Sequence, residues 1–277
     1  MIAYCAAWIV LKSLEWSPLP VAHRLARFYA RLLDLAVPRL RRVAYENLAS
    51  ALPGADHPRI IDGVFRSIAR VLVAFARFPR MEPLRCEGGE YFADALRAGR
   101  GVLFATAHLG NWEFSALAHS QITGPMNVMV RALDNPRIDA LVESRRQQSG
   151  NRVILKKDSA RTILKALAAN EAVGILIDQN AAVEEGVFID FFGKPACAGA
   201  GFVKLAARSG AAVIPGFALW LEKEQTYVLR FYPPVAITGD VARDTQALHS
   251  LLEAVIREYP DQWLWIHRRW KTQPPTI

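Results

Sequence analysis

The stretch GVLFATAHLGNWEFSALA, Gly101 to Ala118, contains the transition that decides the fold. A mostly apolar run, 101–107, is followed by His108, a glycine, an asparagine and a glutamate, and then by an apolar pattern of a different period. A short apolar run that ends in a turn is typical of a buried strand, and apolar residues three and four apart are typical of a helix. We therefore predict a strand over 101–107, a tight turn, and a helix over 112–122.

Short apolar runs alternate with amphipathic stretches through the rest of the chain. Further strands are predicted over 126–132, 152–155, 172–178, 212–220 and 226–235, and helices over 136–148, 159–169, 199–209 and 244–258. This alternation predicts an α/β fold with a mostly parallel or mixed central sheet covered by helices. Residues 1–98 show helical periodicity and no strand pattern. We therefore expect an all-helical, membrane-associating N-terminal extension, 1–98, packed as one compact body with an α/β core, 99–277.

The chain of 277 residues carries a net charge of +8 and is 52% hydrophobic. Its longest apolar run, Met1 to Leu11, is shorter than the roughly 20 residues that span a bilayer, and it lacks the pattern of a secretory signal. Arg24, Arg27 and Arg31 recur at helical spacing among apolar residues. Such a helix suits an anionic membrane surface, although a solvated helix face gives the same pattern. No nucleic-acid module is present, so no nucleic acid partner is expected.

The sequence contains no recognisable pattern for a disulfide framework, a zinc site or a nucleotide-binding loop. The 3 cysteines are widely separated and form no disulfide or zinc-ligand spacing, so we expect a reducing, cytosol-facing environment. The pair Gly193-Lys194 lacks the spacing of a phosphate-binding loop, and no G-x-G-x-x-G follows a predicted strand.

Polar residues stand at the predicted carboxyl ends of three strands: His108, Arg131 and Asp178. In open α/β sheets the ligand crevice lies beyond the carboxyl ends of the strands. These three side chains are therefore expected to converge on one edge of the sheet.

His108 and Glu113 form a candidate acid–base pair. Within one helix, residues five apart point in directions about 140° apart. If a helix begins at Asn111, however, Glu113 lies in its first turn and can fold back towards the imidazole. A histidine oriented by a carboxylate is a general base, and without a G-x-S-x-G elbow we expect the proton to come from a substrate hydroxyl. The alternative is a histidine that ends a strand and a glutamate that caps a helix. A metal is not expected, because a third ligand is missing.

Several blocks together resemble a known family. TAHLGNWE (106–113) resembles the H-x₄-D/E block of glycerolipid acyltransferases, and more narrowly of the bacterial lipid A late acyltransferases, the lauroyl and myristoyl transferases. The remaining blocks that resemble this family, in order, are RRVAYENLASALP (41–53), VRALDNP (130–136), IDQN (177–180), EGVFIDFFGKPA (185–196), LAARSGAAVIP (205–215) and DQWLWIHRRWK (261–271).

The resemblance implies a monotopic or peripheral enzyme on the cytoplasmic face of the bacterial inner membrane. It would move a fatty acyl chain from acyl carrier protein or coenzyme A to a hydroxyl of a membrane glycolipid, with no metal or dissociable cofactor. Other possible acceptors are phosphatidylinositol mannosides, lysophospholipids and amino-acid lipids, and an inactive lipid-binding relative is a further alternative.

The resemblance also implies roles for individual residues. His108 would be the base and Glu113 its orienting partner, while Asn111 and Arg131 would polarise the thioester carbonyl or hold a phosphate. The residues expected to line the acceptor site or the acyl tunnel are Asp178, Gln179, Phe191, Phe192 and Gly193. Three alternatives stay open: an Arg131–Asp178 scaffold pair, core packing of the two phenylalanines, and a structural role for HRRWK (267–271).

Overall fold

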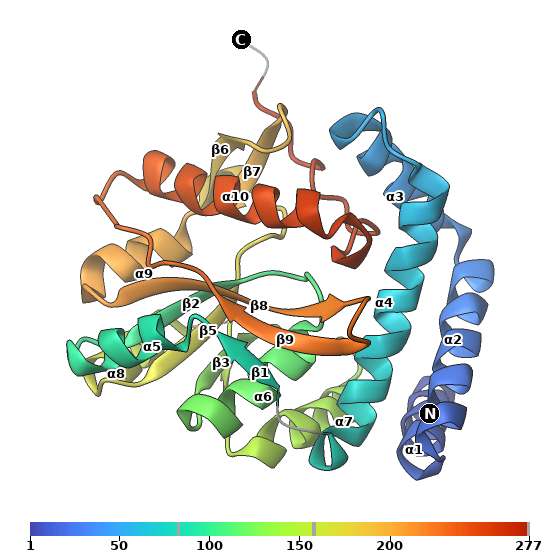
Figure 1. Cartoon of the computed structure of the whole chain (residues 1–277). Coiled ribbons are helices and arrows are strands. Elements are labelled where there is room, and N and C mark those ends of the chain that lie inside the picture. The colour runs from blue at the N-terminus through green and yellow to red at the C-terminus, as the bar shows by residue number, and fades with distance from the viewer. Residues whose placement is uncertain (82–83, 157–158, 276–277) are drawn as a thin grey trace.

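A seven-stranded sheet with the order β1-β9-β8-β2-β5-β3-β4 forms the centre of the molecule (Figure 1). The computed structural model describes residues 1–81, 84–156 and 159–275, so the last two residues of the predicted core lie outside the described part. The strands are β1 (Arg85–Glu87), β2 (Val102–Thr106), β3 (Asn127–Val130), β4 (Arg152–Leu155), β5 (Ala172–Leu176), β8 (Ala212–Leu221) and β9 (Thr226–Phe231). Among the described strands of this sheet, β8 and β9 form the one antiparallel pair. The predicted mixed, mostly parallel sheet is confirmed.

Helices cover both faces of this sheet. The α-helices of the described residues are α1 (Ile2–Trp16), α2 (Leu19–Ala36), α3 (Pro38–Ala51), α4 (His57–Arg77), α5 (Gly89–Arg97), α6 (Trp112–Thr123), α7 (Pro136–Arg146), α8 (Ser159–Ala168), α9 (Gly201–Ser209) and α10 (Val241–Glu258). Side chains alternate along a strand. Leu103 and Ala105 of β2 therefore pack towards α8 and α9, whereas Val102 and Phe104 pack towards α5. This two-sided burial explains why the strands are continuous apolar runs.

Short polar side chains set the starts of several helices. The side chain of Asn111 accepts a hydrogen bond from the backbone N–H of Phe114 at the start of α6. Asn135 and Asp240 cap α7 and α10 in the same way. Because these caps satisfy backbone N–H groups that have no partner within the helix, each of these helices begins directly after its capping residue.

The N-terminal helices pack outside the sheet. α4 lies between the sheet and the pair formed by α1 and α2 (Figure 1), and alanines at 22, 26 and 30 let α2 approach α4 closely. Within the described residues, no helix is both long enough and apolar enough to cross a bilayer.

Two elements differ from the sequence-based expectation. Residues 1–98 are not purely helical, because β1 (Arg85–Glu87) pairs with β9 at the edge of the sheet. The strands β6 (Gly186–Asp190) and β7 (Pro195–Gly199) form an antiparallel hairpin, and neither of them is among the strands predicted from the sequence. β1 is only three residues long, too short to show a period-two pattern.

Candidate functional site

His108 and Asp178 meet at the carboxyl ends of two neighbouring parallel strands. β2 and β5 pair in a register that places Thr106 opposite Leu176, and each polar residue follows two positions later. The His108 Nδ1 lies 2.9 Å from Oδ1 of Asp178, and the backbone N–H of His108 donates to Oδ2 at 2.9 Å. The register of the sheet therefore holds the imidazole against a carboxylate at two points.

A tryptophan completes the surroundings of Asp178. The indole Nε1–H of Trp263 donates to Oδ2 of Asp178 at 2.9 Å, and both residues are buried. Asp178 therefore accepts three hydrogen bonds and has little freedom to rotate. Nε2 of His108 makes no hydrogen bond within the described part of the chain, so this nitrogen is left to act on a bound molecule.

The charges of the pair stabilise each other. Burial raises the pKa of the Asp178 carboxyl, but the charge of His108 and the hydrogen bonds outweigh burial, so this pKa lies below its ordinary value. Burial also disfavours the imidazolium of His108. Here again the charge of Asp178 and its hydrogen bond prevail, and the pKa of His108 lies above its ordinary value. Asp178 is thus the carboxylate that supports a proton on His108.

This geometry corrects the expected pairing of His108 with Glu113. The carboxylate of Glu113 accepts two hydrogen bonds from Arg146 of α7, from Nε at 2.9 Å and from Nη2 at 2.5 Å. No hydrogen bond joins Glu113 to His108 in the described residues, although the charge of Glu113 contributes to the raised pKa of His108. Glu113 therefore lies near His108 without a hydrogen bond to it, and Asp178 is the carboxylate that holds the imidazole.

The turn after His108 requires glycine. Gly110 has φ +64°, and a Cβ at this position would lie 2.0 Å from the carbonyl oxygen of Ala218. The same turn is tied to the C-terminal segment, because Leu109 bridges Trp263 and the backbone N–H of Leu264 donates to the carbonyl of His108. The C-terminal block therefore holds the strand end that carries His108.

A cavity of about 990 Å³ opens beside the imidazole. Its walls include His108, Glu113 and Arg146. The buried apolar side chains that line it are Phe104, Leu117, Met126, Ile175, Phe202 and Phe231. The exposed cations among its lining residues are Arg131, Lys156, Lys204 and Arg208. A cavity of this size with apolar walls and a few polar groups is typical of a small-molecule or lipid site.

His119 lies in the buried wall of this cavity. Its ring packs edge-on against Phe104, with the ring centroids 4.2 Å apart. Burial lowers the pKa of His119 to about 3, so this imidazole is neutral at neutral pH.

The sequence matches a known protein family over almost its whole length. The family model described as bacterial lipid A biosynthesis acyltransferase matches residues 1–272. The chain belongs to this family of acyltransferases.

Several curated proteins are similar to this chain over most of its length. A phosphatidylinositol mannoside acyltransferase of Mycolicibacterium smegmatis is 29% identical over 97% of this chain and 90% of its own. The lipid A biosynthesis lauroyltransferase of Escherichia coli is 26% identical over 98% of this chain and 90% of its own. A lipid A biosynthesis acyltransferase of Haemophilus influenzae is 25% identical over 78% of this chain and 70% of its own.

Five residues expected at the substrate site of the acyltransferase are not among those that line the cavity. Asp178 is buried and holds the imidazole of His108. Asn111 is fully buried and caps α6. Phe191 and Phe192 belong to the core and pack on Trp263. Gly193, with φ +71°, belongs to the turn between β6 and β7. The structure thus gives the two phenylalanines the core positions that the sequence left as an alternative.

The remaining expected residues take different positions. Gln179 and Arg131 line the cavity, and Arg131 is 83% exposed and 3.7 Å from Asp134. The alternative of an Arg131–Asp178 pair is therefore wrong. In the HRRWK block, Arg269 is fully buried and donates to the carbonyl of Cys197, whereas Arg268 is exposed.

Two residues of the site, Arg146 and Trp263, were not predicted from the sequence. Arg146 is one of many arginines in amphipathic stretches, and nothing local marks it. Trp263 belongs to the block at 261–271 that resembles the family, but its side-chain contact with a residue 85 positions away leaves no spacing signal in the sequence. Among the described residues, no group of three or more His, Cys, Asp or Glu side chains is arranged to hold a metal. That the reaction needs no cofactor stays a prediction.

Proposed function

We propose that this acyltransferase moves a fatty acyl chain from an acyl carrier protein or coenzyme A thioester to a hydroxyl group of a lipid A-type glycolipid, with His108 as the general base. The observation that carries the proposal is the hydrogen bond between His108, which lines a cavity with apolar walls, and the buried carboxylate of Asp178. The family, and the named activity of the relative from Escherichia coli, support this acceptor.

The proposed reaction is a direct transfer. Nε2 of His108 takes the proton of the acceptor hydroxyl while the hydroxyl oxygen attacks the thioester carbonyl. The carbon–sulfur bond then breaks, and the imidazolium returns its proton to the departing thiolate. Asp178 keeps Nδ1 protonated and stabilises the imidazolium as it forms. General-base assistance of this kind contributes about 10²–10⁴-fold in rate.

The cations at the cavity have a proposed role in binding. Arg131, Lys156, Lys204 and Arg208 are exposed, and their charges suit the phosphates of a glycolipid or of a coenzyme A or carrier-protein donor. Gln179 lines the same cavity and is proposed as a donor to the acceptor or to the thioester carbonyl. The apolar wall is proposed to hold the acyl chain.

A second acceptor class has support of its own. The relatives named phosphatidylinositol mannoside acyltransferases are 28–29% identical over 97% of this chain. A mannoside hydroxyl on an anionic lipid presents the same chemistry as a lipid A sugar. The proposed base serves either acceptor, and the acceptor is selected by the residues of the cavity.

An acyl-transfer assay with mass-spectrometric detection tests the proposal. Purified protein is incubated with one of two donors, lauroyl-acyl carrier protein or lauroyl-coenzyme A, and with a lipid A precursor, a phosphatidylinositol mannoside, a lysophospholipid or an amino-acid lipid. We expect one added acyl chain on the lipid A precursor. Transfer to the mannoside alone would establish the second acceptor, and binding of lipid without transfer to any acceptor would show an inactive relative.

Membrane association is proposed to occur through α2. Its exposed apolar residues Phe28, Leu32 and Leu35 lie at helical spacing, and Arg24, Arg27 and Arg31 are exposed beside them. An apolar stripe beside a basic stripe is the pattern of helices that lie in an anionic bilayer interface. A monotopic or peripheral position on the cytoplasmic face of the inner membrane is the location that we propose.

Vesicle binding checks this location. The triple change Phe28→Ser, Leu32→Ser and Leu35→Ser removes most of the apolar stripe, and we expect at least about tenfold weaker binding to phosphatidylglycerol-containing vesicles. Binding of the wild type should weaken as salt is added, because the arginine contribution is screened. Leu155→Ser, which removes an exposed leucine on β4, should bind as the wild type does. Equal binding of the triple variant would contradict docking through α2.

The pH dependence of the reaction follows from the pKa of His108. The base must be neutral to accept a proton, and its pKa lies above the ordinary histidine value of about 6.5. The acid limb of kcat/KM is therefore expected above pH 6.5, with activity rising as the pH increases through it. Rates measured from pH 5 to 9 with saturating donor and limiting acceptor locate this limb. A midpoint below pH 6 would show that Asp178 does not act on the base as proposed.

A further inference from the structure

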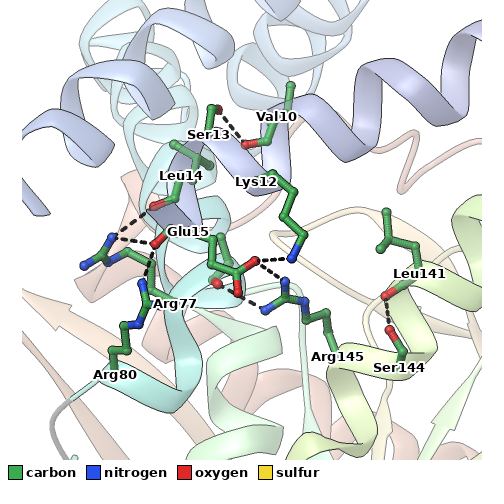
Figure 2. A network of polar contacts seen from close by, with 11 residues as sticks. Val10, Lys12, Ser13, Leu14, Glu15, Arg77, Arg80, Leu141, Ser144 and Arg145 are labelled. Carbon is green, nitrogen blue, oxygen red and sulfur yellow. Dashed lines mark hydrogen bonds and ion pairs between the residues drawn. The ribbon is translucent and has the colours of Figure 1, made fainter. Parts of the chain in front are cut away.

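A network of charged side chains joins the end of α1 to α7 (Figure 2). The carboxylate of Glu15, near the C-terminus of α1, accepts a hydrogen bond from Lys12 at 2.8 Å and one from Arg145 of α7 at 2.5 Å. The Arg145 side chain is only 7% exposed and also donates to the carbonyl of Ala76 in α4. Arg145 is thus a buried cation whose partners come from two other helices.

The end of α1 is itself fixed by arginines. Arg77 donates from Nη1 to the carbonyls of Leu14 and Ser17, at 3.1 and 2.5 Å. Arg80 donates to the carbonyl of Glu15 at 2.6 Å (Figure 2). The last carbonyls of a helix have no partner within it and attract cations. Glu15 is therefore held at a defined point on α4, and Arg145 attaches α7 to that point.

The next residue of α7 reaches the catalytic centre. Arg146 holds the carboxylate of Glu113 through two hydrogen bonds, and both residues line the cavity beside His108. The last turn of α7 is therefore held on two sides, by Glu15 through Arg145 and by Glu113 through Arg146. A shift of this turn changes the position of Arg146 and leaves the Glu113 charge less neutralised.

We propose that Glu15 and Arg145 are a positioning pair for the acyl-transfer reaction, which keeps Arg146 on Glu113 beside the catalytic base. Neither residue is among those that line the cavity, so each acts through the last turn of α7. The inference rests on the proposed role of His108. It makes α1, which carries the exposed apolar residues Trp8, Ile9 and Trp16, a part of the catalytic apparatus as well as a surface helix.

The charged and titratable groups that act on His108 come from four elements. They are Asp178 after β5, Glu113 in α6, Arg146 in α7 and His267 in the C-terminal segment. After burial and Asp178, Glu113 raises the pKa of His108 and Arg146 lowers it. When Arg146 moves away from Glu113, its opposing effect is lost and the pKa of His108 rises.

The variants Glu15→Ala and Arg145→Met test the pair. For each we expect kcat about tenfold lower, because a small misplacement beside a reacting group is costly, and an acid limb of the rate profile at higher pH. Arg145→Lys keeps the charge and should restore part of the rate. The decisive measurement combines Glu15→Ala with Glu113→Gln. If Glu15 acts through Glu113, the double variant has the kcat of Glu113→Gln alone.

Lys12→Gln is the matched control. Lys12 contacts the same carboxylate oxygen of Glu15 but does not reach α7, so this variant should keep the wild-type kcat and pH profile. Thermal unfolding and circular dichroism show whether each variant is folded. If the losses of Glu15→Ala and Glu113→Gln multiply, or if Lys12→Gln matches Glu15→Ala, the pair is only structural and the inference is wrong.

An NMR titration of the His108 ring separates this inference from the proposed function. The pKa of His108 should rise in Glu15→Ala and stay unchanged in Lys12→Gln, whether or not a substrate is turned over. A wild type without transferase activity would contradict the proposed function, whereas an unchanged His108 titration in Glu15→Ala would contradict the positioning pair.

Discussion

The variant His108→Ala is expected to lose acyl transfer almost completely, with kcat lower by about 10³-fold or more. Nε2 of His108 makes no hydrogen bond within the described residues, and Nδ1 is held by Asp178, so the imidazole has one nitrogen for substrate and one for orientation. Alanine leaves no group at this point that takes a proton from a hydroxyl. The loss corresponds to the upper part of the range for general-base catalysis.

Single-turnover transfer from a radiolabelled acyl thioester measures this loss directly. Donor binding should change little, because the apolar wall of the cavity is intact, so the effect belongs to kcat. His23→Ala is the control, since His23 lies in α2 and does not line the cavity, and its kcat should stay within about twofold of the wild type. Transfer by His108→Ala at a rate near the wild type would exclude the direct-base mechanism.

The position of this base was predictable from sequence, because it depends on local patterns. A continuous apolar run indicates a strand buried on both faces. Asn111 marks the start of the next helix, and the predicted helix over 112–122 is observed as α6 (Trp112–Thr123). His108 therefore had to stand at the edge of the sheet.

The orienting partner of the base was not predictable in the same way. Sequence distance favoured Glu113, whereas the sheet brings in Asp178, 70 residues away, through the pairing of β2 with β5. Strand order is a global property that apolar runs do not show. The convergence of His108 and Asp178 on one edge was expected, but the contact between them depends on the two strands being neighbours.

The C-terminal block illustrates a similar limit. Its aromatic residues are evident in the sequence. One of them, Trp263, both packs in the core and contacts a residue of the site. Trp263 fills the core between Phe191 and Trp265, and its indole N–H also binds the carboxylate of Asp178. A pattern of aromatic residues cannot distinguish a core tryptophan from one that orients a catalytic carboxylate, since both are buried.

The variant Asp178→Asn is expected to lower kcat by about 10³–10⁴-fold while leaving the fold intact. The reason lies in the three donors that face this side chain. Oδ2 accepts from the backbone N–H of His108 and from the indole of Trp263, and Oδ1 faces Nδ1 of the imidazole. An asparagine must place its single oxygen on the first two donors, because neither of them can accept a hydrogen bond.

The amide nitrogen of the substituted side chain then faces Nδ1 of His108 and donates to it. Nδ1 must lose its proton to accept, so the neutral ring carries its proton on Nε2, the nitrogen proposed to face the substrate. The base is present in the wrong tautomer. In a serine protease, the equivalent change costs about 10⁴-fold in kcat with the geometry intact.

The pH profile and an NMR titration distinguish this tautomer effect from unfolding. Without the charge of Asp178, burial and the charge of Arg146 outweigh the charge of Glu113, so the pKa of His108 should fall and the remaining activity should have its acid limb at lower pH. Nitrogen chemical shifts of the ring should show the proton on Nε2. The control Asp94→Asn makes the same chemical change on the surface of α5, where the side chain pairs with Arg97, and should leave kcat and the titration unchanged. An Asp178→Asn variant with near-wild-type kcat would mean that another group orients His108, and Glu113 would then be the first to test, since its charge already acts on the same ring.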